Sequence, residues 1–275
     1  MEIRGKNALV LGAARGIGRA IARKLADKGM RLVLPWFDWL GSCQEMEAEF
    51  AAMEAGHISM QVDLRDAHSV AKMAEQIHKE FGALHLLVNN IERGGMPVVH
   101  GSYTHPVNNE QWQLEMDTTL HAKWLVFDHC LILLRRAEQA AVVNISSIAA
   151  RTGRSGPAGL LFNDGYAAAN RGVSLLTETW ARLGAPNIRV NELMLGLVDQ
   201  RHGPGTRGWE LLSDAEREQL MDHTLLRRTG TPDEVASAVL FLARDADFMS
   251  GACLRMDGGF VLGGDQVPEM PDGVL

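Results

Sequence analysis

A glycine-rich stretch near the N-terminus constrains the fold of this chain more than any other feature. The apolar run 8–11 leads directly into Gly12, Gly16 and Gly18, and an amphipathic pattern follows from Ile17 onward. Glycines let the backbone turn tightly and approach a pyrophosphate, while the N–H groups at the start of a helix attract negative charge. A strand, this motif and a helix in succession therefore predict a site for the diphosphate of a dinucleotide, with Ile17 among its contacts.

The rest of the chain alternates short apolar runs with helical patterns. Seven runs have the length of strands, at residues 8–11, 32–34, 58–62, 84–88, 141–145, 188–193 and 252–256. Between them, apolar residues recur three and four positions apart, as in the stretches 17–25 and 70–81. Parallel strands joined by crossover helices have this pattern, so we predict an α/β fold: a doubly wound, seven-stranded parallel sheet of Rossmann type. We expect residues 1–275 to form a single dinucleotide-binding domain.

The sequence also predicts where two helices begin and which two segments contact the substrate. Thr231 with Glu234, and Ser213 with Glu216, have the spacing of capping boxes, so helices are expected to begin there. The segments 92–108 and 197–225 follow strands at the sheet edge where ligands bind in such folds. We therefore predict that both segments contact a small-molecule substrate.

Composition excludes several other kinds of protein. A net charge of −7 gives no general attraction to nucleic acid or to anionic lipid, so neither is an expected partner. The chain has no secretory signal pattern and no apolar stretch long enough to span a bilayer, which predicts a cytoplasmic protein without a membrane partner. Cys43, Cys130 and Cys253 lie far apart and are odd in number, so we expect free thiols. The histidines form no metal-binding motif, and we predict no metal site.

Further landmarks follow the glycine motif in order. They are Asp63 after the third predicted strand, Asn89 and Asn90 after the fourth, Ser146 and Ser147 after the fifth, Tyr166 in a helical pattern, and Asp257, Gly258 and Gly259 near the end. Together with the GxxxGxG spacing, they make the chain resemble the short-chain dehydrogenase/reductase family over almost its whole length. The resemblance implies that Asp63 and Leu64 border the adenine of an NAD or NADP cofactor and that Asn89 lies beside the adenosine ribose. Gly196 keeps the glycine of the family's Pro-Gly pair after the sixth strand, where the cofactor is bound.

The choice between NAD and NADP depends on residues that follow the second predicted strand. Asp38 has the spacing of the acid that hydrogen-bonds the ribose 2′-hydroxyl and repels a 2′-phosphate. Counting from Gly29, however, the family's acid falls at Trp36, and Arg15 beside Gly16 favours a phosphate instead. Charge repulsion from Asp38 gives a slight preference for NAD.

The catalytic positions match the family only in part. The resemblance implies that Tyr166 relays a proton to or from the substrate oxygen and that Ser147 hydrogen-bonds the same oxygen. A phenol has an ordinary pKa of about 10, so this role needs a nearby positive charge. The family supplies it with a lysine four residues after the tyrosine, and here that position is Asn170, which can bind the nicotinamide ribose but carries no charge. Arg171 points about 100° further around the helix and is a poor substitute.

Other departures lie in the same machinery. Thr119 stands where the family has an asparagine that holds the proton-relay water, and Glu92 adds an acid close to the expected nicotinamide site. The segment 151–164 is an insertion between Ser147 and Tyr166 that forms a pocket wall or displaces the serine, with Ser155 as an alternative donor.

Two functions are consistent with these residues. The first is an NAD(P)-dependent oxidoreductase of an alcohol or carbonyl substrate. The second is a dinucleotide-binding or regulatory subunit that has lost efficient turnover. The resemblance also implies a homo-oligomer, and the stripe formed by Trp124, Phe127, Leu131 and Leu134 suits either a subunit interface or internal packing.

Overall fold

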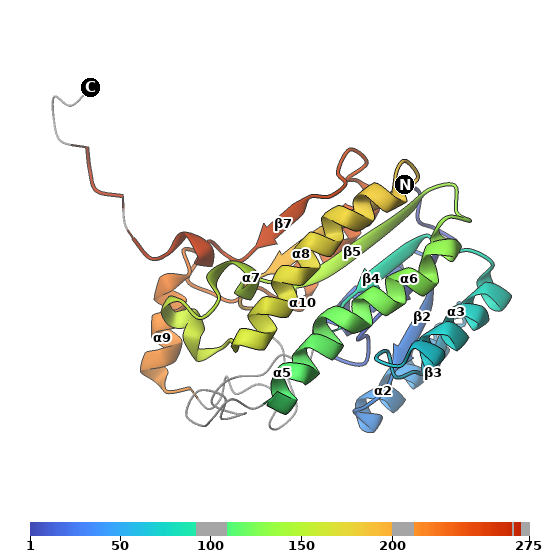
Figure 1. Ribbon diagram of the computed structural model, residues 1–275, viewed down its shortest axis with the longest axis horizontal. Coiled ribbons are helices and arrows are strands. Elements are labelled where there is room, and N and C mark those ends of the chain that lie inside the picture. The colour runs from blue at the N-terminus through green and yellow to red at the C-terminus, as the bar shows by residue number, and fades with distance from the viewer. Residues whose placement is uncertain (92–108, 200–211, 266, 271–275) are drawn as a thin grey trace.

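The computed structural model describes residues 1–91, 109–199, 212–265 and 267–270. Strands and helices alternate along the chain (Figure 1). Their order is β1 (Asn7–Val10), α1 (Gly16–Asp27), β2 (Arg31–Trp36), α2 (Leu40–Ala51), β3 (Ile58–Gln61), α3 (Ala67–Phe81), β4 (Leu86–Asn89), α5 (Asn109–Glu115), the π-helix η1 (Met116–His121), α6 (Ala122–Leu134), β5 (Ala140–Ser147), α7 (Ala149–Thr152), the 3-10 helix η2 (Gly156–Leu160), α8 (Asp164–Gly184), β6 (Ile188–Leu195), α9 (Asp214–His223), α10 (Pro232–Arg244), β7 (Cys253–Met256) and the 3-10 helix η4 (Phe260–Leu262).

Among the described residues, seven strands form one sheet in the order β3-β2-β1-β4-β5-β6-β7. Every neighbouring pair is parallel, which confirms the predicted doubly wound Rossmann-type sheet. β2, β4, β5 and β6 end one or two residues later than the apolar pattern indicated, and two of these extensions carry predicted site residues. β4 includes Asn89, which pairs with Asn144, and β5 continues to Ser147, which pairs with Leu195 of β6. The polar residues Asn89 and Ser147 are therefore held by backbone pairing at the carboxyl edge of the sheet.

Helices cover both faces of the sheet. One core cluster joins the sheet to α1, α2 and α10, and it includes Ile21, Met46 and Val239. A second cluster joins the opposite face to α3, α6 and α8 through residues such as Met73 and Val126. Since β1, β4 and β5 lie in the middle and are buried along their length, their apolar runs are continuous rather than alternating.

The predicted helix starts are confirmed. Ser213 and Glu216 form a complete capping box at the start of α9, and Thr231 and Glu234 form another at α10. The predicted substrate segment 92–108 lies outside the described residues. Of the segment 197–225, the structure describes 197–199 and 212–225, most of which is α9.

The stripe on α6 divides between the interior and the surface. Phe127 stacks on Trp180 of α8 with ring centroids 4.1 Å apart, and Leu134 is fully buried. Trp124 is 43% exposed. Internal packing therefore accounts for Phe127 and Leu134, and the four residues do not share one exposed face.

No described helix is both long and apolar enough to cross a bilayer. No group of three or more His, Cys, Asp or Glu side chains in the described ranges could hold a metal ion. Cys43, Cys130 and Cys253 are free cysteines, the Cys43 thiol donates to the carbonyl oxygen of Asp38 at 3.0 Å, and burial raises the pKa of Cys130 to about 12.

Candidate active site

The glycine loop lies where the strand order reverses. β1 is followed by β2 and β3 on one side and has β4 as its other neighbour, so the carboxyl ends of β1 and β4 flank the switch point of the sheet. A Cβ atom on Gly18 would lie 2.1 Å from the backbone oxygen of Gly12, and one on Gly12 would lie 2.2 Å from the backbone oxygen of Asn90. These contacts leave no room for side chains, so the loop, α1 and the end of β4 pack backbone to backbone.

The start of α1 leaves donors for an anion. Arg15 is the N-cap residue and its side chain makes no capping hydrogen bond. Gly16, Ile17 and Gly18 form the first turn, whose N–H groups have no partner within any α-helix. The positive end of the helix dipole lies at the same place. The arrangement suits the diphosphate that the sequence predicted here.

Arg19 fixes the loop from behind, and the sequence analysis missed it. Its buried guanidinium donates to the carbonyl oxygens of Ala13 at 3.0 Å, Ala14 at 2.7 Å and Ser42 at 2.8 Å, and it pairs with Glu49 at 2.7 Å. In a trans peptide the N–H points opposite to the C=O. The bonds to the Ala13 and Ala14 carbonyls therefore direct the N–H groups of Ala14 and Arg15 away from the Arg19 guanidinium. A cation in the first turn of a helix is unfavourable because it opposes the helix dipole. The presence of Arg19 at the start of α1 was therefore the sequence signal that could have indicated its structural role.

The predicted adenine side contains an unexpected ion pair. Arg65 binds Asp63 through two hydrogen bonds of 2.8 and 2.7 Å, and these hold the pKa of the Asp63 carboxyl below its ordinary value. The same guanidinium lies 5.3 Å from the ring centroid of Phe37. Leu64 is 6% exposed and belongs to a core cluster. Asp63 is therefore engaged by Arg65, and Leu64 is largely a packing residue.

The residues at the end of β2 differ from the family pattern, in which an acid binds the ribose 2′-hydroxyl. Trp36 occupies that position, and its indole N–H donates to Glu47 on α2 at 2.8 Å. Beyond it, Trp39 has a left-handed backbone conformation with φ of 64°, and the Arg15 guanidinium lies 3.5 Å from the centroid of its ring. Asp38 lies between these residues on an exposed turn. Asp38, which favours NAD, and Arg15, which favours NADP, thus lie at the same turn.

Tyr166 lies in the first turn of α8, one of the helices on the α3 and α6 face. Asn163 caps this helix and accepts the N–H of Tyr166 at 2.7 Å. The Tyr166 side chain is 4% exposed and packs with Ile148, Ala149 and Phe162 in a third apolar cluster. Ile148 and Ala149 directly follow β5, so the tyrosine lies next to the strand end that carries the predicted serine.

Three buried amides have acceptors without partners among the described residues: Asn7 at the start of β1, and Asn89 and Asn170 at the predicted site. Asn170 donates to the Tyr166 carbonyl at 3.0 Å, but its Oδ1 has no partner, and the Oδ1 of Asn89 has none either. Both side chains are fully buried. A buried acceptor without a donor is costly, and hydroxyl groups of a bound molecule would satisfy it. A dinucleotide, which carries two riboses, fits these acceptors and the glycine loop.

Ser147 and Ser146 have different surroundings at the end of β5. The Ser147 hydroxyl oxygen accepts the N–H of Ala149 at 3.2 Å, so its own hydrogen remains for another acceptor. The Ser146 hydroxyl donates to Glu192 on β6 in a very short hydrogen bond. Ser174 of α8 donates to the same Glu192 oxygen at 2.9 Å. Glu192 is 1% exposed, and the sequence analysis did not single it out.

Thr119 lies in the π-helix η1, and a single-turn π-helix is frequent at functional sites. Its hydroxyl is 3.4 Å from Glu115, and Asn163 donates to the other oxygen of that carboxylate at 3.3 Å. Glu115 therefore connects Thr119 to the cap of the helix that carries Tyr166. Gly196 directly follows β6, and a Cβ atom there would be 2.6 Å from the Cα of Asp257.

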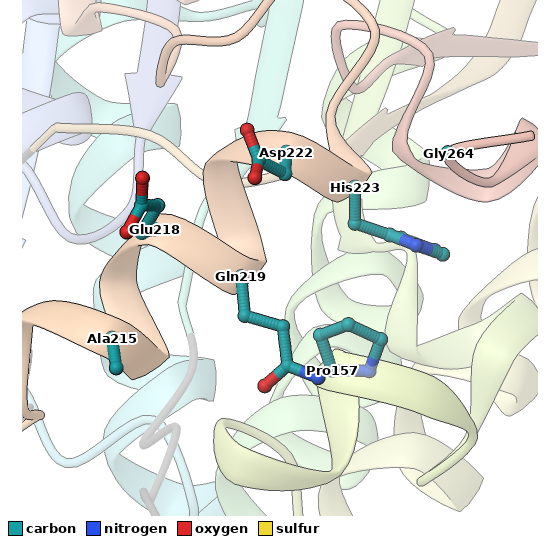
Figure 2. Close-up of a pocket in the computed structure, with 7 residues that line it drawn as sticks. All are labelled: Pro157, Ala215, Glu218, Gln219, Asp222, His223 and Gly264. Carbon is teal, nitrogen blue, oxygen red and sulfur yellow. The ribbon is translucent and has the colours of Figure 1, made fainter. Parts of the chain in front are cut away.

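The insertion 151–164 contacts both α9 and Tyr166. Figure 2 shows a groove lined by Pro157, Ala215, Glu218, Gln219, Asp222, His223 and Gly264, so the insertion faces α9 through Pro157. Phe162, from the same insertion, lies with its ring centroid 5.7 Å from that of Tyr166. Ser155 and Arg171 are both exposed, so the structure brings neither the alternative donor nor the neighbouring cation into the site.

Comparisons with known proteins agree with this geometry. A family model described as enoyl-(acyl carrier protein) reductase matches residues 12–261. Among curated proteins, the chain is similar to the 3-oxoacyl-(acyl-carrier-protein) reductase of Staphylococcus aureus, with 29% identity over 262 residues that cover 94% of this chain and 98% of that protein. The corresponding reductase of Thermotoga maritima is 28% identical over 271 residues, which cover 95% and 100% of the two chains.

Solved structures show the same likeness. The ligand-free aldohexose dehydrogenase of Thermoplasma acidophilum superposes with a TM-score of 0.75 at 27% identity, covering 97% of this chain and 98% of that one. A short-chain dehydrogenase/reductase of Brucella melitensis, titled glucose/ribitol dehydrogenase, has a TM-score of 0.78 at 25% identity, with 94% and 98% covered. Sequence and fold therefore point to the same group of proteins.

Proposed function

The chain belongs to the short-chain dehydrogenase/reductase family, and we propose that it transfers hydride between a nicotinamide dinucleotide and the carbonyl or alcohol carbon of a small molecule. The observation that carries the proposal is the position of Tyr166 and Ser147 at one strand end, beside two buried amide acceptors and the glycine loop. The polar groups of such a site, rather than the fold, specify its chemistry.

The dinucleotide would be held by the residues between Gly12 and Gly18, by Asn89 and by Asn170. The first-turn N–H groups of α1 would bind the diphosphate, while the two unpaired Oδ1 atoms would accept ribose hydroxyls. When bound, the nicotinamide donates or accepts the hydride. Gly196, which has no side chain, lets the backbone after β6 pack closely against Asp257.

Tyr166 and Ser147 would act on the substrate oxygen. The Ser147 hydroxyl, whose oxygen already accepts a backbone N–H, would donate its hydrogen to that oxygen and orient it. Tyr166 would give a proton to the oxygen during reduction and take it back during oxidation. Thr119 and Glu115 would hold the helix cap behind Tyr166 in place. The buried setting excludes water and strengthens each of these interactions.

Turnover with a panel of substrates tests this function. We expect the wild-type protein to consume reduced nicotinamide with at least one class of carbonyl compound, measured by the loss of nicotinamide absorbance. The panel should include 3-oxoacyl thioesters and aldoses, because similar proteins carry the corresponding names. A protein that binds the dinucleotide but turns over nothing, and that gains activity in Asn170→Lys, would instead be the binding or regulatory subunit.

A preference for NAD over NADP is the second part of the proposal. The Asp38 carboxylate lies on the turn after β2 and would repel a 2′-phosphate, whereas the Arg15 guanidinium is stacked against Trp39. We expect NADH to bind more tightly than NADPH, and Asp38→Asn to strengthen NADPH binding by about tenfold, close to 1.4 kcal/mol. Titration of each nucleotide into both proteins measures the change. Asp27→Asn, at the far end of α1, is the matched control, and a wild type that prefers NADPH would refute the argument.

A homo-oligomer is the third part. Four large apolar side chains are exposed on two helices of the same face: Trp124 and Ile132 on α6, and Leu175 and Leu183 on α8. Phe127 and Trp180 stack between these helices and hold them together. Exposed apolar side chains on packed helices favour association, and a two-fold axis would let each copy cover the other with the same residues.

A further inference from the structure

Lys123 is a buried lysine that the sequence analysis did not single out. It lies on α6, only 1% of its surface is exposed, and it is among the largest fully buried side chains of the described chain. An ammonium group in a protein interior is costly unless other groups compensate its charge or the protein uses it. A lysine at this position therefore needs a physical reason.

The ammonium group of Lys123 lies at the strand end that carries the site. Its Nζ donates to the carbonyl oxygen of Ile145 at 2.7 Å, and Ile145 comes two residues before Ser147 on β5. Tyr166 packs against Ile148 and Ala149, which follow the same strand. Lys123 from α6 and Tyr166 from α8 therefore meet the end of β5 from two neighbouring helices.

Hydrogen bonds also connect the helix of Lys123 to the helix of Tyr166. Thr119 lies one turn before Lys123, and its hydroxyl is bonded to Glu115 at 3.4 Å. Glu115 accepts from Asn163 at 3.3 Å, and Asn163 accepts the Tyr166 N–H at 2.7 Å. This chain of contacts holds the start of α6 in a defined position relative to the start of α8.

The charged groups around Tyr166 come from several elements. Glu115 from α5, Lys123 from α6 and Glu192 from β6 are each 1% exposed. At the margin, Asp164 has a side chain 66% exposed and pairs with Arg154 at 3.6 Å, while His223 of α9 packs against the Phe260 ring. Solvent screens Asp164, but it does not screen the three buried groups. The two buried carboxylates disfavour a phenolate, and the buried ammonium favours it.

We propose that Lys123 supplies the positive charge that Asn170 does not carry, and that it acts as a positioning residue by lowering the proton affinity of the Tyr166 phenol. The inference rests on the proposed function, in which Tyr166 moves a proton. A charge in the low-dielectric interior acts over a longer distance than in water, so it can come from α6 rather than from the next turn of α8. The family position on α8 can then hold a neutral amide for the ribose.

A titration of Tyr166 in the protein without cofactor or substrate tests the proposal. The chain has two tyrosines, Tyr103 and Tyr166, so a Tyr103→Phe background leaves one phenol to follow by NMR of ring-labelled tyrosine. We expect Lys123→Met to raise the pKa of Tyr166 by about one or more, whereas Lys123→Arg changes it by less than about 0.3. A folded Lys123→Met protein in which Tyr166 titrates as in the parent would overturn the proposal.

Lys123→Gln covers the case in which Lys123→Met does not fold, because the amide keeps a donor for the Ile145 carbonyl and removes only the charge. The same upward change in the pKa of Tyr166 is expected. With Tyr103 intact, the pH profile of kcat should move to higher pH while KM stays constant, and adding Asn170→Lys should move it back. If the pH profile of kcat in Lys123→Gln is the same as in the wild type, the Lys123 charge does not act on Tyr166.

The pKa of Tyr166 and the turnover rate can change independently of each other. If no substrate is turned over and the pKa of Tyr166 still rises in Lys123→Gln, the electrostatic inference holds and the oxidoreductase proposal fails. If turnover is found and the pKa of Tyr166 is the same in all variants, the function holds and Lys123 is only a packing residue.

Discussion

Gly18→Ala should weaken dinucleotide binding strongly, with Kd rising by about a hundredfold or more, equivalent to ~2.7 kcal/mol. The added Cβ would lie 2.1 Å from the Gly12 carbonyl oxygen and 2.7 Å from the Asn90 side-chain amide. The Gly12 oxygen belongs to the backbone, and the Asn90 amide is held by the hydrogen bond that it donates to the Leu11 carbonyl, so neither can move aside at little cost. The start of α1 would have to move away from the loop, and its N–H groups would no longer converge on a diphosphate.

Gly41→Ala is the matched control for this substitution. Gly41 also lies in the first turn of a helix that follows a strand, but a Cβ there meets no atom within 4 Å. We expect Gly41→Ala to bind NADH as the wild type does and to be slightly more stable, because alanine favours helix over glycine. Calorimetric titration with NADH, together with circular dichroism to verify the fold, gives the comparison. Wild-type affinity in a folded Gly18→Ala protein would show that the diphosphate lies elsewhere.

The sheet and its helices could be predicted because their signals are local. Each central strand is buried on both faces, so its sequence is a continuous apolar run, and α1 and α3 bury one stripe each. The capping boxes at Ser213 and Thr231 are equally local. The end of β5 could not be located in this way. Ser146 and Ser147 extend the strand because β6 continues opposite them, and that partner is distant in sequence.

The buried charges of the site could not be predicted for a related reason. Glu192 is bonded to Ser146, 46 residues away, and Lys123 is bonded to a carbonyl 22 residues away. A single sequence shows a charged residue but not its partner, and a charge within a helix is ordinarily a surface residue. The helix 122–134 is apolar nearly all round, so its periodicity does not indicate which face Lys123 occupies. The same holds for Glu115, which is bonded to an asparagine on another helix.

The positive charge expected beside Tyr166 shows what spacing along one helix can and cannot indicate. Spacing alone correctly indicated that Asn170 lies on the same helix as Tyr166, one turn on, and that Arg171 points away from it. It did not indicate that α6 places an ammonium group at β5 close to the same strand end. A motif read along one helix cannot include a group that another helix contributes.

Tyr166→Phe should lower kcat by about 10²- to 10⁴-fold and leave the Kd for NADH almost unchanged. The substitution removes one hydroxyl and keeps the ring, which is 4% exposed and packs on Phe162, Ile148 and Ala149. Packing and the N-cap bond that the backbone N–H of residue 166 donates to Asn163 are preserved, so the fold and the dinucleotide site should be intact. Only the group that carries the proton is lost.

Two serine variants provide the comparison that separates a chemical role from a structural one. Ser147→Ala removes a hydroxyl whose oxygen accepts only a backbone N–H among the described residues, and it should lower kcat to a similar degree. Ser155→Ala removes an exposed hydroxyl from the insertion and should have no effect. Steady-state rates with the best substrate, and NADH titrations of each variant, decide the matter. Robust turnover by Tyr166→Phe would mean that another group carries the proton, and a loss in Ser155→Ala but not in Ser147→Ala would show that the insertion supplies the donor.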